Sequence, residues 1–282
     1  MIDLRQLTPP TRSAGGNRAR QCWLLLAPAM LFLGGCHTAS IAPPPAPQNL
    51  LAHWSSESVT VDGRLLESVW EHAVAYPLSF SLADSPEGQS PSEAGTVRLA
   101  WDNEYLYAAF EFQDSDVIEE GDADQLQQQR TGDVAELFLK PQGQPWYWEF
   151  HVTARARKSA FFFPSQGRSG LPSNFDFEHG TRAGAMIDGT LNEWSDQDGG
   201  WTAEMAIPLR DLSVQGEDFD PDSEWRVLAA RYNYAYSLPA PELSSAPQLP
   251  RTSFHDHPHY GFLQFQKPHS AAGATETPDT AN

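Results

Sequence analysis

One glutamate stands inside an apolar stretch that is typical of a buried strand. The segment Val134–Lys140 reads VAELFLK, and Glu136 lies in it between Ala135 and Leu137. An ionised carboxylate is costly in apolar surroundings unless a partner binds it. Two interpretations follow: either a lysine or arginine of a neighbouring strand pairs with Glu136, or Glu136 belongs to a polar binding site on a β-sheet.

Three histidines form an H-x-H-x-H motif in the last part of the chain. In an extended segment His255, His257 and His259 would point to one side, which suits a transition metal. Pro258 interrupts the run, and no matching cluster of cysteine or glutamate is evident in the sequence. A metal site, a loop that contacts a ligand and a solvated loop therefore all stay open.

An acidic segment offers hard oxygen ligands of the kind that calcium prefers. Its carboxylates belong to Asp114, Asp116, Glu119, Glu120, Asp122 and Asp124. The order of an EF-hand is missing, because Glu119 stands where the turn glycine belongs. Structural calcium, with Asp114 and Asp116 as candidate ligands, is one interpretation, and a solvated acidic loop is the other.

The elements that must position these residues are short strands. Apolar and other residues alternate before and after the WDNEY turn at Trp101–Tyr105, which predicts a β-hairpin with one buried face. The expected strands are Thr96–Trp101, Leu106–Gln113, Val134–Lys140, Trp146–Thr153, Ala160–Phe163, Gly184–Gly189, Trp201–Ile207, Trp225–Tyr234 and Gly261–Gln266. Helical periodicity is confined to brief pieces at Leu65–Ala73 and Leu209–Leu212.

This pattern predicts an all-β fold, an antiparallel β-sandwich with immunoglobulin-like or jelly-roll-like layers and a few short helices. The loops Gly167–Phe177 and Ala235–Ser253 are long for a compact domain, and such loops are often functional.

The N-terminus has the features of a lipoprotein signal peptide. Four arginines precede a short apolar stretch at Cys22–Leu33, which ends in the sequence LGGC at Cys36. We expect residues 1–35 to be the signal peptide and Cys36 to be the lipidated first residue, with ordinary secretory cleavage as the alternative. His37 rather than aspartate follows Cys36, which favours sorting to the outer membrane of a bacterial cell envelope.

Composition limits the partners of the mature chain. Removal of residues 1–35 takes away four arginines and one aspartate, which leaves 14 basic and 36 acidic side chains. Nucleic-acid binding needs a basic surface and is therefore excluded. Once Cys22 is removed and Cys36 is lipidated, no cysteine remains for a disulfide. We expect a Pro-rich tether at 36–50, one domain at 51–267 and a disordered tail at 268–282.

Seven segments in order resemble carbohydrate-binding module family 9 and the lipoproteins related to it. They are VDGRLLESVWEHA, LAWDNEYLYAAFEFQD, GDVAELFL, WYWEFHVTA, WTAEMAIPL, WRVLAARYN and FHDHPHYGFLQF, and they extend from about Val59 to Phe265. The resemblance implies a non-catalytic β-sandwich that binds sugar between aromatic side chains beside a strand carboxylate. Calcium commonly supports the structure of modules in this family, so the resemblance also implies structural calcium in this chain.

The resemblance assigns roles to individual residues. Glu136 corresponds to the glutamate that contacts sugar, and Asp133 opens the same motif. Of the two aromatic positions that hold the sugar, one is Arg130 in this chain and the other is Phe254. The loss of one ring is the departure from the family pattern. Either Trp146 or Trp148 in the next strand replaces it, or, as the face that they share favours, one of them belongs to the core.

Four further residues occupy strand positions where the family places polar sugar contacts: His151, Thr153, Arg231 and Asn233. The alternative for each is an ordinary core or surface residue. Core packing explains the tryptophans in the structural motifs, Trp70, Trp101, Trp201 and Trp225.

The leading hypothesis is a membrane-anchored, non-catalytic carbohydrate-binding protein. Three alternatives remain: a structural envelope lipoprotein that has lost its sugar site, a component of glycoside hydrolysis in carbohydrate catabolism, and a haem-binding relative of this sandwich fold. No catalytic carboxylate pair can be identified in the sequence. The mature chain has only Met186 and Met205 as axial methionines.

Overall fold

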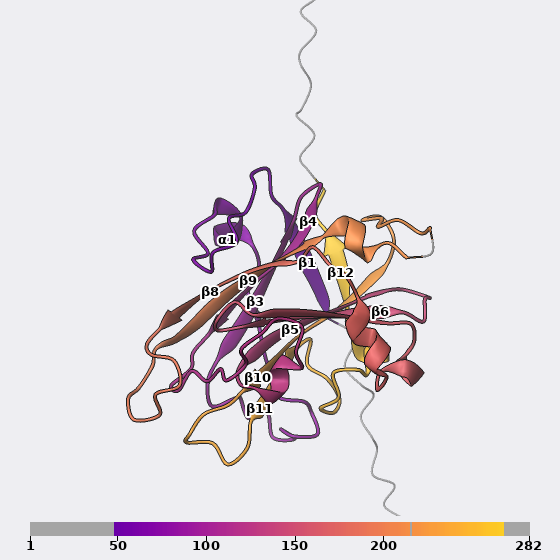
Figure 1. The fold of residues 1–282 in the computed structure, drawn as a ribbon. Coiled ribbons are helices and arrows are strands. Elements are labelled where there is room, and N and C mark those ends of the chain that lie inside the picture. Colours follow the sequence, from indigo (N-terminus) through magenta and orange to yellow (C-terminus); the bar gives the residue numbers. More distant parts are fainter. Residues whose placement is uncertain (1–47, 215, 268–282) are drawn as a thin grey trace, which may run out of the picture. The chain divides into compact units, whose positions relative to one another are not determined.

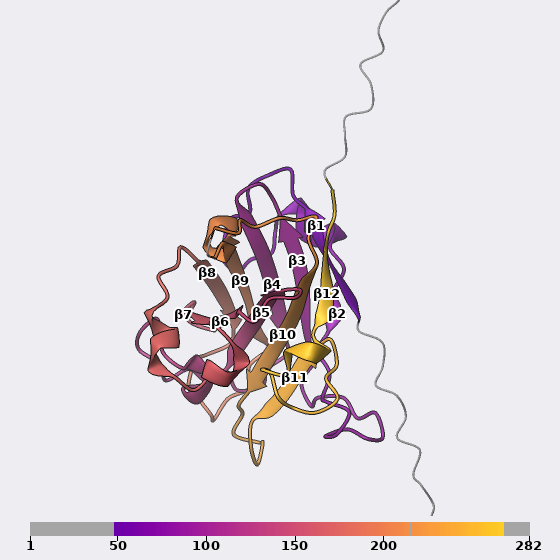
Figure 2. The ribbon, with the colours of Figure 1, turned by 90° about the vertical axis from the view of Figure 1, so that its right-hand side faces the viewer.

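The computed structural model describes residues 48–214 and 216–267, and these residues form a β-sandwich. Figure 1 and Figure 2 show its two layers of strands. The first layer consists of β5 (Val134–Pro141), β6 (Tyr147–Thr153), β7 (Lys158–Phe163), β10 (Trp225–Asn233), β11 (Glu242–Ala246) and β12 (Gly261–Phe265). The second consists of β1 (Asn49–Trp54), β2 (Tyr76–Pro77), β3 (Gly95–Trp101), β4 (Tyr105–Phe112), β8 (Arg182–Asp188) and β9 (Gly200–Pro208). The predicted all-β sandwich is confirmed.

The strands form one continuous hydrogen-bonded sheet that folds over on itself. Its order is β7-β6-β5-β10-β12-β1-β3-β4-β9-β8, with β11 on β10 and β2 on β3. The layers join where β1 pairs with β12, side by side in Figure 2. β1 pairs in parallel with both β12 and β3, whereas the other pairs are antiparallel. The sandwich is thus antiparallel except at this junction.

The core lies between the layers, where β6 faces β8 and β9. Its side chains are the inward-facing half of each alternating strand, for example Leu99 in β3, Phe110 in β4 and Trp148 in β6, all fully buried. Each such side chain contributes about 1.5–3 kcal/mol through its burial. The four tryptophans predicted as core residues are all buried as well: Trp70, Trp101, Trp201 and Trp225.

The VDGRLLESVW motif forms a structural anchor rather than a ligand site. Its helix α1 (Ser68–His72) is shorter than the predicted helix, and the indole Nε1 of Trp70 donates a 2.9 Å hydrogen bond to Glu204. The backbone N–H groups of Asp62 and Gly63 donate to the other oxygen of the same buried carboxylate. Gly63 has a positive φ of 83°, and a Cβ there would lie 2.5 Å from the carbonyl carbon of Ala185. Only glycine fits this position without strain.

A second apolar cluster covers the outer face of the first layer. Phe254 packs there on Phe138 and Tyr232, with ring centroids 6.3 and 5.5 Å apart, and Phe175 packs on Phe161 at 4.6 Å. The covering segments belong to the long loops predicted from the sequence or directly follow them. They contain β11 and the 3₁₀ turns Gln166–Arg168, Pro172–Asp176 and His257–His259. The outer face of this sheet is therefore filled by the chain's own side chains.

Some predicted elements differ from the structure. The H-x-H-x-H motif is not extended, because His257–His259 forms a 3₁₀ turn. The sequence analysis predicts neither β11 nor β1, which starts at Asn49, just before the expected domain start. The piece Leu209–Leu212 is a 3₁₀ turn, and another spans Gln128–Arg130.

Among the described residues, no helix is long and apolar enough to cross a membrane. The predicted signal peptide, the lipidated Cys36, most of the tether and the tail lie outside the described residues.

Candidate functional site

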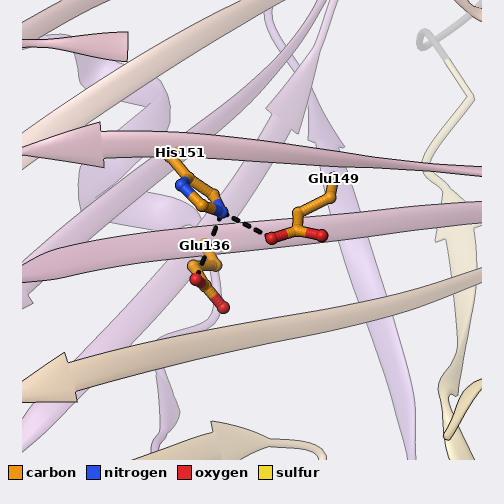
Figure 3. A group of neighbouring side chains, drawn as sticks. All are labelled: Glu136, Glu149 and His151. Carbon is orange, nitrogen blue, oxygen red and sulfur yellow. Dashed lines mark hydrogen bonds and ion pairs between the residues drawn. The ribbon is translucent and has the colours of Figure 1, made fainter. Parts of the chain in front are cut away.

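The strand pair β5–β6 brings two carboxylates and one imidazole together on the covered outer face. Glu136 pairs across the strands with His151, and Glu149 lies two residues before His151 on the same face. The His151 Nε2 atom lies 3.1 Å from Glu136 Oε1 and 2.6 Å from Glu149 Oε1 (Figure 3). All three side chains are buried, and Glu136 is only 1% exposed.

This cluster answers the question that Glu136 raised in the sequence. Its partner is a histidine of the neighbouring strand, not the lysine or arginine considered above, and the sequence analysis did not predict that Glu149 shares it. Burial raises the pKa of Glu136. Burial also lowers the pKa of His151, but the two carboxylates outweigh it and raise that pKa to about 10. The two carboxylates therefore favour the protonated, cationic form of the imidazole.

The other residues predicted on this face do not form an open platform with Glu136. Phe254 is 7% exposed and covers the sheet. Thr153 is fully buried, and its Oγ1 accepts a hydrogen bond from the Arg157 backbone N–H. Arg130 is exposed at the end of its 3₁₀ turn. Trp148 is part of the core, so it does not replace the missing ring.

Arg231 and Asn233 lie on the opposite, inner side of the sheet. Arg231 Nη2 donates to Asp114 Oδ2 at 2.9 Å and to Asn233 Oδ1 at 2.5 Å, and its guanidinium stacks 4.5 Å from the ring of Phe112. Asn233 in turn donates to Glu93 Oε2 at 2.8 Å. The residues predicted as polar sugar contacts therefore lie on two opposite faces of one sheet. Arg231 and Asn233 connect the end of β10 to other segments, and Arg231 binds the residues that directly follow β4.

The carboxylates proposed for calcium are engaged by the chain itself. Asp114 pairs with Arg231 and also accepts a hydrogen bond from the indole of Trp201 at 3.1 Å. A guanidinium at this position does not fit a calcium ion on Asp114. Asp116 Oδ2 accepts a 2.5 Å hydrogen bond from the backbone N–H of Tyr236. Calcium elsewhere in the protein stays a prediction.

Asp133 is a loop anchor. Its two oxygens accept 2.7 Å hydrogen bonds from the backbone N–H groups of Ile118 and Tyr234, and the side chain is fully buried. Together with Asp116 it holds the segments that follow β4 and β10 against each other. These segments form the floor of a hollow that the sequence analysis did not predict.

Two aromatic rings stand exposed beside this hollow. Trp194 is 62% and Tyr236 is 72% exposed, and their ring centroids lie 5.1 Å apart with an interplanar angle of 35°. The hollow has a volume of about 410 Å³. Its lining is formed by Asp116, Ile118, Trp194, Tyr234, Ala235, Tyr236, Leu238, Ala240 and Pro241. In the part of the chain that the structure describes, these are the two exposed large aromatic residues.

The loop that carries Trp194 is held in place from both sides. The side-chain amide of Asn192 exchanges 2.8 Å hydrogen bonds with the backbone N–H and C=O of Glu119. Asp198 accepts a further bond from the backbone N–H of Val117. The rings therefore stand on a loop with defined geometry. The signals in the sequence were a tryptophan in a polar loop without strand periodicity, and a tyrosine in the long segment 235–253.

The comparisons with known proteins place this β-sandwich in a class of carbohydrate-binding modules. Residues 61–220 match the family model described as "Carbohydrate family 9 binding domain-like". The chain belongs to this family, as the resemblance in the sequence indicated.

Solved structures show the same fold at low sequence identity. A protein from Bacteroides uniformis to which carbohydrate binding has been attributed is 15% identical, with a TM-score of 0.59 over 78% of this chain and 100% of its own. A family 9 module from Caldicellulosiruptor kristjanssonii in complex with cellotriose is 12% identical, with a TM-score of 0.53 over 82% and 100%. A family 9 module from Caldicellulosiruptor kristjanssonii in complex with glucose is 11% identical, with a TM-score of 0.51 over 80% of this chain and 100% of its own. No curated protein matches the chain.

Proposed function

We propose that this protein is a non-catalytic carbohydrate-binding protein, anchored to the bacterial outer membrane through lipid on Cys36. The observation that carries the binding role is the exposed pair Trp194–Tyr236 beside its hollow, on a sandwich of this family. An exposed indole and phenol of this kind are costly to solvate and are typical of a recognition surface.

The proposed ligand is a neutral sugar chain. The apolar face of a pyranose ring stacks on a flat aromatic side chain, which supplies contact area at little entropic cost. Tyr236 and Asp116 are among the residues that line the hollow, and side chains of these types can exchange hydrogen bonds with sugar hydroxyls. The chain carries a net charge of −19, which disfavours anionic polysaccharides. Because two structural neighbours hold cellotriose and glucose, β-glucans are the first ligands to test.

A second candidate is a structural envelope lipoprotein that has lost its sugar site. The observation in its favour is that Glu136 and His151, the residues predicted to contact sugar, are buried beneath the chain's own aromatic side chains. Sugar contact by Glu136 stays a prediction, and it requires displacement of side chains that bury this glutamate.

Isothermal titration and pull-down on insoluble polysaccharide test the binding role. Cellotriose, glucose, xylan, β-glucan and peptidoglycan are the probes, each with and without calcium. Saturable binding of at least one neutral glycan is expected, without release of reducing sugar. Absence of binding across the whole panel would contradict the proposal and favour the structural role, and release of reducing sugar would favour a role in glycoside hydrolysis.

The membrane anchor is tested separately. Mass spectrometry of the mature N-terminus is expected to find acyl chains on Cys36, and Cys36→Ser is expected to release the protein from the outer-membrane fraction. An unmodified N-terminus at a different residue would refute lipidation while leaving sugar binding unaffected.

A further inference from the structure

The geometry points to a binding site for a divalent transition-metal ion such as Zn²⁺ or Co²⁺, formed by Glu136, Glu149 and His151 with His255 at its solvent side. This site lies on the outer face of β5 and β6, and it shares no residue with the lining of the aromatic hollow.

The donor atoms already stand close to coordination distance. One ligand atom from each of Glu136, Glu149 and His151 lies within 4.8 Å of the other two. Bonds of about 2.0 Å place tetrahedral ligand atoms about 3.3 Å apart. The distance from His151 Nε2 to Glu136 is 3.1 Å and the distance to Glu149 is 2.6 Å, so an ion would widen the first by about 0.2 Å and the second by about 0.7 Å.

A fourth ligand is present at the edge of the cluster. His255 Nε2 lies 3.8 Å from the second oxygen of Glu149, and this imidazole is 40% exposed. Its Nδ1 atom lies 3.0 Å from the hydroxyl of Tyr147, which orients the ring so that Nε2 faces the carboxylate. Metal-bound histidines typically have such a partner on the other ring nitrogen.

The charge of the cluster favours a divalent cation. Among the described residues, no lysine or arginine pairs with Glu136 or Glu149, which share His151, and the more distant His255 lies beside Glu149 alone. Two carboxylates bring negative charge into a buried place, where uncompensated charge is costly. The two positive charges of a divalent ion bound by two carboxylates and neutral imidazoles compensate both negative charges.

Hydrogen bonding within the cluster is incomplete. Glu136 Oε2 is buried and has no hydrogen-bond partner among residues 48–214 and 216–267, so a lone pair on this carboxylate is free for an ion. His151 Nδ1 also has no partner, but this nitrogen carries a proton both in the imidazolium and in the metal-bound ring. The unpartnered Nδ1 atom therefore favours neither the metal-free nor the metal-bound cluster.

The mixture of donors selects the class of metal. Imidazole nitrogens suit zinc, cobalt, nickel and copper, whereas calcium and magnesium are bound by oxygen ligands in larger numbers. Two carboxylates with two imidazoles therefore predict preference for Zn²⁺ over Ca²⁺.

The experiment uses the full chain without a histidine tag, treated with a chelator and then titrated with Zn²⁺, Co²⁺ and Ca²⁺. One Zn²⁺ per chain is expected to bind and to raise the melting temperature. Co²⁺ is expected to give visible absorption bands of a site with nitrogen and oxygen ligands, which Zn²⁺ displaces. Ca²⁺ is expected to bind at least 100-fold more weakly at this site.

His255→Ala removes a ligand that is exposed and is expected to weaken Zn²⁺ binding at least tenfold without unfolding the protein. His259→Ala is the matched control, because His259 lies in the same segment but pairs with Asp256. Glu149→Gln is expected to abolish the cobalt spectrum. The proposal is overturned by the absence of saturable Zn²⁺ binding, or by equal affinities of the two histidine variants. Since no readout involves sugar, such a failure is distinct from failure of carbohydrate binding.

Discussion

Replacement of Trp194 by alanine tests whether the exposed rings bind sugar. A tryptophan side chain has a surface of the order of 250 Å². Since 62% of Trp194 is exposed, about 150 Å² is free, and one ring face accounts for roughly half of it. Covering about 75 Å² with a pyranose contributes about 2 kcal/mol at 25 cal/mol per Å². The expected loss for Trp194→Ala is therefore about 20-fold in Kd.

Stability is expected to change little in this variant. The ring contacts Tyr236 at a centroid distance of 5.1 Å but contributes to none of the three apolar clusters. Loss of one exposed aromatic contact costs about 1 kcal/mol. Isothermal titration with the glycan that the wild type binds, together with thermal unfolding, separates a binding defect from a folding defect.

Two further variants make the test specific. Trp194→Phe keeps an aromatic face and is expected to lose only a few-fold in affinity. Leu66 is another exposed apolar residue, 77% exposed and far from Trp194 in the sequence. Leu66→Ala is therefore expected to bind the glycan as tightly as the wild type does. Wild-type affinity in both Trp194→Ala and Tyr236→Ala would refute the role of the hollow.

Three other predictions follow from the buried parts of the structure. Gly63→Ala is expected to cost about 1 to 3 kcal/mol in urea unfolding, because φ is 83° and Ala185 leaves no room for a Cβ; an unchanged midpoint would contradict this. Burial raises the pKa of Asp114 from 3.8 to about 6, so its protonation stabilises the fold below pH 4, and this contribution is lost as the pH rises through 6. Carboxyl NMR of the wild type should show a titration midpoint of Asp114 at about 6, and Arg231→Gln should raise that midpoint because the guanidinium lowers the pKa of Asp114. A wild-type midpoint near 4 would refute the assignment. Glu136→Gln is expected to leave glycan affinity unchanged, whereas a tenfold loss would show that sugar reaches this residue.

Most of the strands could be predicted from local pattern. Period-two alternation in β3, β4 and β9 reflects one face packed on the core, and this signal is strong wherever a strand is half buried. β1 carries too little alternation to be predicted, and its sequence NLLAHW acquires its place through parallel pairing with β3 and β12. Parallel partners are far away in the sequence, so no local rule indicates them.

The candidate site was predicted less well, for a geometric reason. Alternation places Glu136 and His151 on one face and Arg231 on the other only once the register of β5, β6 and β10 is known. Whether a face is open depends on what lies over it. Phe254 was expected to be a sugar platform, but it directly follows the long loop 235–253 and packs on the sheet as part of its cover.

By itself, the sequence determined the class of fold, the family, the acidic character and the unusual carboxylate of Glu136, because these depend on residue type and local spacing. Only the tertiary structure decided that Glu149 and His151 share that carboxylate, and that Trp194 and Tyr236 meet at an exposed hollow. The two rings come from loops more than 40 residues apart in the sequence. Their meeting depends on the hydrogen bonds of Asn192, Asp116 and Asp133, which hold the loops between strands of both layers.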